Sequence, residues 1–183
     1  VNTFLLIASL ALTAWYATTK DMSPIRVRGL SGTLVVIGSA SLLFLGASGA
    51  ITALGDTLFP STSLAAGIQN DFSPTAHYLI QMRVYHPAIA VSIGFYLFGV
   101  TWYLRRVFSD QRIHLMTNVL FGLYISQILI GIVNVALLAP VWIQIIHLLN
   151  SNLVWIAFVL LSREVLSGFS PGLNHQPVNK PVE

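Results

Sequence analysis

The fold is decided by residues 81–87, Gln81-Met82-Arg83-Val84-Tyr85-His86-Pro87, which interrupt the long apolar run 77–104. A guanidinium, an imidazole and a proline within five positions are costly to place in lipid. Ionisable residues inside a membrane segment are candidates for function by default. A second histidine, His147, lies in another apolar run. His147 is therefore a candidate partner for His86 across a bundle of membrane helices.

The composition excludes a soluble protein. Of the 183 residues, 55% are hydrophobic and 8% are charged, and the mean hydropathy is +0.77, whereas soluble domains carry roughly 25% charged residues. An integral membrane protein is therefore predicted. No basic stripe or aromatic-interleaved patch supports nucleic acid as a partner. Cysteine is absent, which excludes disulfides, thiolate metal ligands and cysteine nucleophiles.

Four apolar runs reach the roughly 20 residues that a membrane-spanning helix needs; they are 29–54, 77–104, 113–138 and 140–162. A shorter run at the start lacks a methionine and a basic leader, so it is expected to be the remainder of a transmembrane helix from a preceding half. The predicted fold is all-α and integral to the membrane, a four-helix transmembrane bundle preceded by one partial transmembrane helix. The expected divisions are 1–19 for the partial helix, 20–28 for a cytoplasmic loop, 29–168 for the bundle with an outer loop at 55–76, and 169–183 for a disordered cytoplasmic tail.

Charge orients the helices. Basic residues occupy the first and third connections, at Lys20, Arg26, Arg28, Arg105, Arg106 and Arg112, while the loop 55–76 holds Asp56 and Asp71 without any Lys or Arg. By the positive-inside rule, the basic connections and the C-terminus face the cytoplasm. The expected location is a bacterial cytoplasmic membrane.

Helix ends and helix faces carry further signals. Ser73-Pro74 predicts an N-cap followed by proline in the first helical position, and Pro140 predicts the start of the last helix in the same way. The second helix is rich in small residues, which let a neighbouring helix or a flat ligand approach its backbone; they include Gly38, Gly46, Ser48, Gly49 and Gly55.

The two histidines lie at matching depths. His86 follows the expected membrane boundary near Tyr78 by about eight residues and His147 follows Pro140 by about seven, so both lie roughly 10–12 Å deep. Their helices both start on the outer side. Two histidines at equal depth can face one another across the bundle, as a bis-imidazole b-type heme requires. The alternative is that each only hydrogen-bonds to a neighbouring helix.

Two neighbours of His86 support the heme interpretation. Arg83 lies one turn nearer the outer surface on the same face, and its guanidinium is predicted to bind a heme propionate through two hydrogen bonds. Pro87 lacks an amide hydrogen and clashes with the carbonyl of Arg83, so a kink is predicted here.

The remaining polar residues receive weaker predictions. Five amides could orient the imidazoles or hydrogen-bond between helices: Gln127, Asn134, Gln144, Asn150 and Asn152. His77 and His114 are expected at the two membrane interfaces and His175 in solvent. Glu164 is expected to form a surface ion pair with Arg163 or to be solvated.

The chain resembles the heme A synthase family. The resemblance lies in VNTFLL (1–6), LALTAW (10–15), GASGA (46–50), GDTLFP (55–60), DFSPTAH (71–77), RVYHP (83–87), LAPVW (138–142) and HLL (147–149). It implies eight transmembrane helices in two similar halves, the second of which binds heme b between two histidines that fall on His86 and His147. The first half would hold a Glu-x-x-His-Arg motif that this chain lacks, because Arg83 stands three residues before His86 and Pro87 follows it.

The resemblance therefore identifies the chain as the second half of such an enzyme plus the end of the first. The complete protein is expected to oxidise the C8 methyl of heme O to the formyl group of heme A for cytochrome oxidase biogenesis, with oxygen from water. This chain alone would lack the catalytic glutamate. Expected and candidate partners are membrane lipid, the missing N-terminal half, a heme O synthase and a second copy of the chain. Two alternatives are a half-length b-type cytochrome module, for electron transfer or heme handling in a larger membrane complex, and a purely structural bundle.

Overall fold

The computed structural model describes residues 2–19 and 23–167, and this part of the chain contains helices and no strand. The predictions for Lys20, His175 and the tail 169–183 concern residues outside the described part. The helices are α1 (Asn2–Thr19), α2 (Gly29–Leu58), α3 (Leu64–Asp71), α4 (Tyr78–Gln81), the 3₁₀ helix η1 (Met82–Val84), α5 (Tyr85–Val107), α6 (Gln111–Ala136) and α7 (Val141–Ser167).

Within residues 2–19 and 23–167, four helical segments are long and apolar enough to cross a membrane. They are Gly29–Leu58, Tyr78–Val107, Gln111–Ala136 and Val141–Ser167. With 26 to 30 residues each, they exceed the roughly 20 residues that span the hydrocarbon layer. Large apolar side chains face outward along them, such as Phe95, which is 74% exposed. The prediction of an all-α integral membrane bundle is confirmed.

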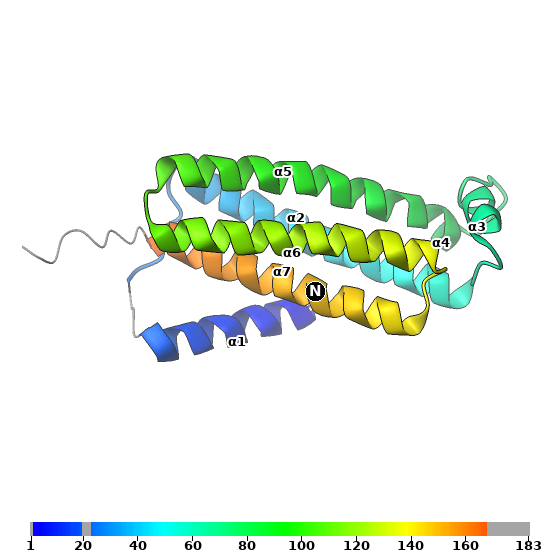
Figure 1. Cartoon of the computed structure of the whole chain (residues 1–183), viewed down its shortest axis with the longest axis horizontal. Helices are drawn as coiled ribbons and strands as arrows, with labels where there is room; N and C mark the ends of the chain where they lie inside the picture. Colours follow the sequence, from blue (N-terminus) through cyan, green and yellow to red (C-terminus); the bar gives the residue numbers. More distant parts are fainter. Residues whose placement is uncertain (1, 20–22, 168–183) are drawn as a thin grey trace, which may run out of the picture.

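The four long helices lie lengthwise beside one another, with α3 at one end of the bundle (Figure 1). Helix α2 packs against α5 and α7, and α6 packs against the same two helices. Helices α5 and α7 therefore lie on the diagonal of the bundle. Both begin at the end that carries α3, which we call the α3 end.

The close-packed core occupies only part of the bundle. Its most buried apolar residues lie away from the α3 end: Leu104, Ile113, Leu120, Phe158 and Leu161, each 1% exposed. Here Gly38 lets α7 approach, because a Cβ at this position would come within 2.6 Å of Phe158 Cζ. In contrast, no residue of 43–54, 80–92, 125–142 or 144–153 is fully buried. The half of the bundle that carries both histidines is thus the less densely packed half.

Two predicted helix starts and the outer loop need correction. Ser73-Pro74 does not begin a helix; α4 begins at Tyr78, where His77 Nδ1 accepts a hydrogen bond from the Leu79 amide at 3.3 Å. The reason is that residues 73–76 close a turn, with Ala76 N–H donating to Ser73 O. Helix α7 begins one residue after Pro140. The segment 55–76 is also not all loop, since α2 continues to Leu58 and α3 forms within it.

The predicted disturbance at Pro87 is present. The helical path from Tyr78 to Val107 changes from α4 to the 3₁₀ segment η1 and back to α5. Since Pro87 has no amide hydrogen, the carbonyl of Arg83 lacks its helical donor, and the preceding turn tightens.

Helix α1 packs along the later part of α7 (Figure 1). Trp155 Nε1–H donates to Phe4 O at 2.7 Å, and the Arg163 guanidinium lies 5.5 Å from the ring of Tyr16. Arg163 and Glu164 pair at 3.3 Å, and they are 2% and 1% exposed. The prediction of a surface ion pair or solvated Glu164 is therefore wrong, because both side chains are buried, with Arg163 over the rings of Trp15 and Tyr16 on α1. Whether α1 is the remainder of a longer span stays a prediction.

Candidate functional site

The imidazole of His86 packs against helix α2. Its Nδ1 lies 2.9 Å from Ser48 Oγ, and Ser48 Oγ also donates to the helical carbonyl of Leu45 at 2.8 Å. The neighbouring Gly49 leaves room for the ring, since a Cβ there would come within 3.0 Å of His86 Cε1. Ser48 and Gly49 together hold the imidazole close to the α2 backbone.

The imidazole of His147 packs against helix α6 in a similar way. A Cβ at Gly131 would come within 3.2 Å of His147 Cε1. Gln127 Nε2 lies 3.0 Å from His147 Nε2, and Asn150 Nδ2 donates to Gln127 Oε1 at 2.8 Å. The other ring nitrogen, Nδ1, is buried without a hydrogen-bond partner among the described residues. An unsatisfied buried polar atom costs about 1–3 kcal/mol, so this nitrogen calls for an explanation.

The two imidazoles belong to diagonal helices. His86 lies eight positions after the start of α4 at Tyr78, and His147 lies six positions after the start of α7 at Val141. Both helices start at the α3 end, so the histidines occupy similar levels of the bundle. Each imidazole rests against a glycine of one intervening helix, α2 or α6. Both stand in the half of the bundle that lacks a close-packed core.

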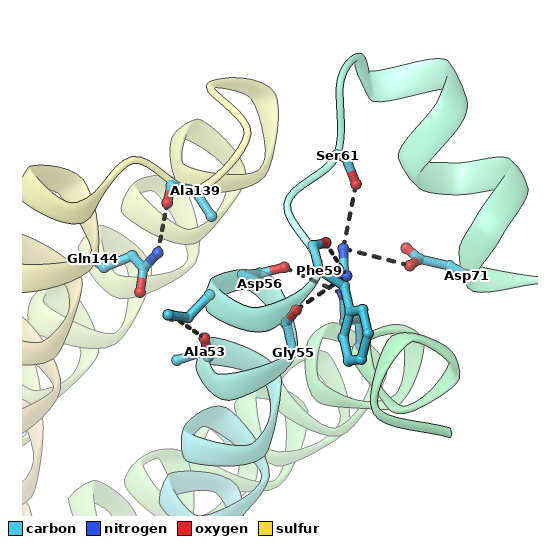
Figure 2. Close-up of polar contacts among 10 residues, drawn as sticks. Ala53, Gly55, Asp56, Phe59, Ser61, Asp71, Ala139 and Gln144 are labelled. Carbon is cyan, nitrogen blue, oxygen red and sulfur yellow. Dashed lines mark hydrogen bonds and ion pairs between the residues drawn. The ribbon is translucent and has the colours of Figure 1, made fainter. Parts of the chain in front are cut away.

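Arg83 lies one turn closer to the α3 end, in a cluster that we call the Arg83 clasp. Figure 2 labels its partners Gly55, Asp56, Phe59, Ser61 and Asp71. Its Nη2–H groups donate to Phe59 O at 2.7 Å and Gly55 O at 3.2 Å, and Nη1 donates to Ser61 Oγ at 3.3 Å. Two carboxylates complete the clasp: Asp56 Oδ1 lies 3.3 Å from Nε, and Asp71 Oδ1 lies 3.9 Å from Nη1. The clasp joins the end of α2, α3 and the 3₁₀ segment.

The charges of the clasp are unbalanced, since two aspartates face one guanidinium. Burial raises the pKa of the Asp71 carboxyl above its ordinary value of 3.8, and attraction to Arg83 offsets only part of that rise. Asp71 is also the more distant of the two carboxylates. The contact between Asp71 and Arg83 is therefore the weakest link of the clasp.

The other sequence-predicted residues divide between the site and its surroundings. Gln127 and Asn150 reach His147, directly or through one another. Gln144 instead donates to Ala139 O at 2.5 Å, where Leu138 and Ala139 both have positive φ in the tight turn before α7. The backbone carbonyl of Asn134 accepts a hydrogen bond from Ala139 N–H in the same turn. At the opposite end of the bundle, His114 Nε2 lies 2.8 Å from Phe108 O.

Sequence reasoning missed four partners of the predicted site residues. The sequence pattern connects neither Ser48 nor Gly131 with the imidazoles, and it indicates Asp56 and Asp71 only as part of an acidic outer loop. A signal for Ser48 existed, because Ser48 and Gly49 lie in the small-residue segment GASGA at the level of His86. Gly131 carried no such signal.

The residues present fit a metal held by two imidazoles. Ser48 occupies only Nδ1 of His86, which leaves Nε2 free of any hydrogen bond from a described residue. In His147, Nδ1 is buried without a partner among the described residues, whereas Nε2 contacts the Gln127 amide, which has to move away before that nitrogen can bind a metal. Both rings lie on glycines, where a side chain would crowd them. Oriented imidazoles of this kind are typical of metal ligands.

Comparison with known proteins identifies the family of the chain. Residues 1–159 match the family model COX15-CtaA, described as cytochrome oxidase assembly protein. Two curated relatives, from two strains of Thermus thermophilus, are 42% identical over 165 residues, and each is named protoheme IX farnesyltransferase. The match covers 90% of this chain and 27% of each relative, so the chain spans about a quarter of their length. No solved structure matches the chain. By its sequence and its fold, the chain belongs to the COX15-CtaA family of cytochrome oxidase assembly proteins, the heme A synthase family.

Proposed function

We propose that this chain is the heme-b-binding half of a heme A synthase. The observation that carries the proposal is the placement of His86 and His147 at similar levels on the diagonal helices α5 and α7, each against a glycine. Iron takes axial ligands from opposite faces of the porphyrin. Two imidazoles on opposite sides of a loosely packed half-bundle suit that requirement better than two separate interhelical hydrogen bonds.

The chain's own residues have distinct roles in this proposal. His86 and His147 bind the iron, and Ser48 and Gln127 orient them. Arg83 binds a heme propionate at the α3 end, where the 3.9 Å contact with Asp71 is the one most easily given up. A heme bound by two histidines supplies one-electron transfer. For His147 to bind through Nε2, Gln127 must release that nitrogen.

The family supports a proposed reaction for the complete protein. The complete protein oxidises the C8 methyl of heme O to the formyl of heme A for cytochrome oxidase biogenesis, with oxygen from water. The glutamate of the family's Glu-x-x-His-Arg motif lies in the other half, and Arg83 occupies the corresponding position here. The activity therefore requires the N-terminal half.

Partners and location follow from the comparisons and the charge pattern. The relatives are named for the farnesylation of protoheme IX, the heme O synthase reaction, which supports a heme O synthase as a partner. Both relatives are bacterial, and basic residues gather at the end opposite α3. These observations support a bacterial cytoplasmic membrane, with that end and the C-terminus in the cytoplasm.

The decisive experiment is a reduced-minus-oxidised spectrum of the protein purified with heme. We expect a low-spin b-type spectrum that is lost or becomes high-spin in His86→Ala and in His147→Ala. His114→Ala is the matched control, because His114 lies at the opposite end of the bundle, hydrogen-bonded to Phe108 O. If both site variants keep the low-spin spectrum, the ligand assignment is wrong. If heme binds but the complete protein forms no heme A, the half-length b-type cytochrome is the better description.

A further inference from the structure

The orientation of the Asn150 amide is fixed by a backbone carbonyl. Leu123 O can only accept a hydrogen bond, and Asn150 Nδ2 lies 3.1 Å from it. The group facing Leu123 must therefore be the NH₂ of the amide. Ser126 Oγ lies 2.8 Å from Leu123 O and 3.2 Å from Asn150 Oδ1, and its single hydrogen can serve only one of them, so the assignment rests on Leu123 O alone.

The same logic continues to His147. Asn150 Nδ2 has a second hydrogen, which it donates to Gln127 Oε1 at 2.8 Å. With its oxygen occupied in this way, Gln127 must present its NH₂ to His147 Nε2, 3.0 Å away. An NH₂ group can only donate, so His147 Nε2 accepts with its lone pair. A neutral imidazole then carries its proton on Nδ1.

An independent network on helix α2 reaches the same result for His86. Ser48 has a single hydroxyl hydrogen, and it donates that hydrogen to Leu45 O at 2.8 Å. With that hydrogen assigned to Leu45 O, which can only accept, the imidazole is the donor in the 2.9 Å contact between His86 Nδ1 and Ser48 Oγ. His86 also carries its proton on Nδ1 and its lone pair on Nε2.

We propose that the Leu45–Ser48 and Leu123–Asn150–Gln127 networks hold both imidazoles in the tautomer protonated on Nδ1, which a metal bound through Nε2 requires. In the metal-free protein, Gln127 hydrogen-bonds to the Nε2 lone pair of His147, which iron would use. Ser48 and Gln127 are then positioning residues with opposite roles. The hydrogen bond from His86 Nδ1 to Ser48 does not involve Nε2, so it can persist when Nε2 binds the metal. The Gln127 bond uses the ligating lone pair and must break. The identity of the metal rests on the proposed function, whereas the tautomers do not.

The tautomers are measured by nitrogen-15 NMR of labelled histidine in the heme-free protein, with resonances assigned by the His86→Ala and His147→Ala variants. We expect both histidines of the wild type to be protonated on Nδ1 alone. In Gln127→Met, His147 should lose this single form and populate both tautomers. Gln144→Met is the matched control, because the Gln144 amide bonds to Ala139 O and not to a histidine. A wild-type His147 protonated on Nε2 would overturn the proposal.

Heme binding provides the second readout, with hemin as the probe and helix content by circular dichroism as the check on folding. Ser48→Ala should weaken heme binding about 10- to 100-fold, as the loss of a partner of a metal ligand does. Gln127→Met should bind heme roughly fivefold faster, because one hydrogen bond no longer has to break. Slower or weaker binding by Gln127→Met would refute its proposed role. If the wild type binds no heme, the proposed function fails, while the NMR measurement still decides the tautomers.

Discussion

The Arg83 clasp allows a quantitative prediction for the variant Arg83→Met, which keeps most of the side-chain volume and removes the charge. The guanidinium donates to Gly55 O, Phe59 O and Ser61 Oγ. The side chains of Arg83, Asp56 and Asp71 are only 10%, 19% and 20% exposed. Water can therefore replace few of these contacts, and removing the guanidinium leaves two carboxylates near one another without their cation.

The expected loss is about 3 kcal/mol, from three hydrogen bonds at a net value of roughly 1 kcal/mol each. This value is a lower bound, because it leaves out the two carboxylates, and breaking a buried ion pair costs about 3–5 kcal/mol. The clasp joins α3 to the bundle, so the loss should appear as local opening of residues 59–77. Since about 1.4 kcal/mol corresponds to a factor of ten, amide exchange there should accelerate roughly 100-fold.

The assay is hydrogen exchange followed by mass spectrometry in detergent, with Arg105→Met as the matched control. Arg105 is on the same helix path as Arg83 but lies in the last turn of α5, where it bonds to Asn118. Exchange in 59–77 that stays within about threefold of the wild type would refute the clasp as a stabilising element. The same variant tests the propionate proposal: full heme retention in Arg83→Met would exclude that role.

Three further predictions follow from single contacts. Asp71→Asn removes a carboxyl whose pKa is raised by burial. A raised acid pKa makes the folded state lose stability as pH rises above 3.8, so thermal unfolding of the variant should depend less on pH above that value than thermal unfolding of the wild type does. A variant less stable than wild type at pH 7 would contradict this. Gly38→Ala should destabilise the bundle by about 1–3 kcal/mol, because the new Cβ would meet Phe158 Cζ at 2.6 Å, while Gly99→Ala, with nothing within 4 Å, serves as the control in denaturant titration. Trp155→Phe removes the hydrogen bond to Phe4 O and should weaken the docking of α1 by about 1 kcal/mol. Amide hydrogen exchange should then be faster than in the wild type in α1 and unchanged in α6. Exchange in α1 equal to that of the wild type would refute this prediction.

Much of the fold was predictable because it depends on local properties of the chain. Hydropathy and length located the four membrane segments, and Pro87 marked the interruption before α5 because a missing amide acts on its own helix. The similar levels of His86 and His147 followed from counting residues from helix starts. Of the two misplaced helix starts, the one at Ser73-Pro74 falls where residues 73–76 close a turn instead, and the one at Pro140 lies a single residue before α7.

The sequence by itself determined a membrane bundle with two histidines at one level, since composition, periodicity and residue spacing are carried along the chain. The tertiary structure alone decided what those residues touch. Arg83 meets carboxylates 27 and 12 positions before it, the buried Arg163 lies over the rings of Trp15 and Tyr16 more than 140 positions away, and each imidazole meets a glycine on a different helix. These contacts depend on how each helix is rotated about its axis and which helices are neighbours. Many side chains across the whole bundle set that rotation together, so no local pattern encodes it.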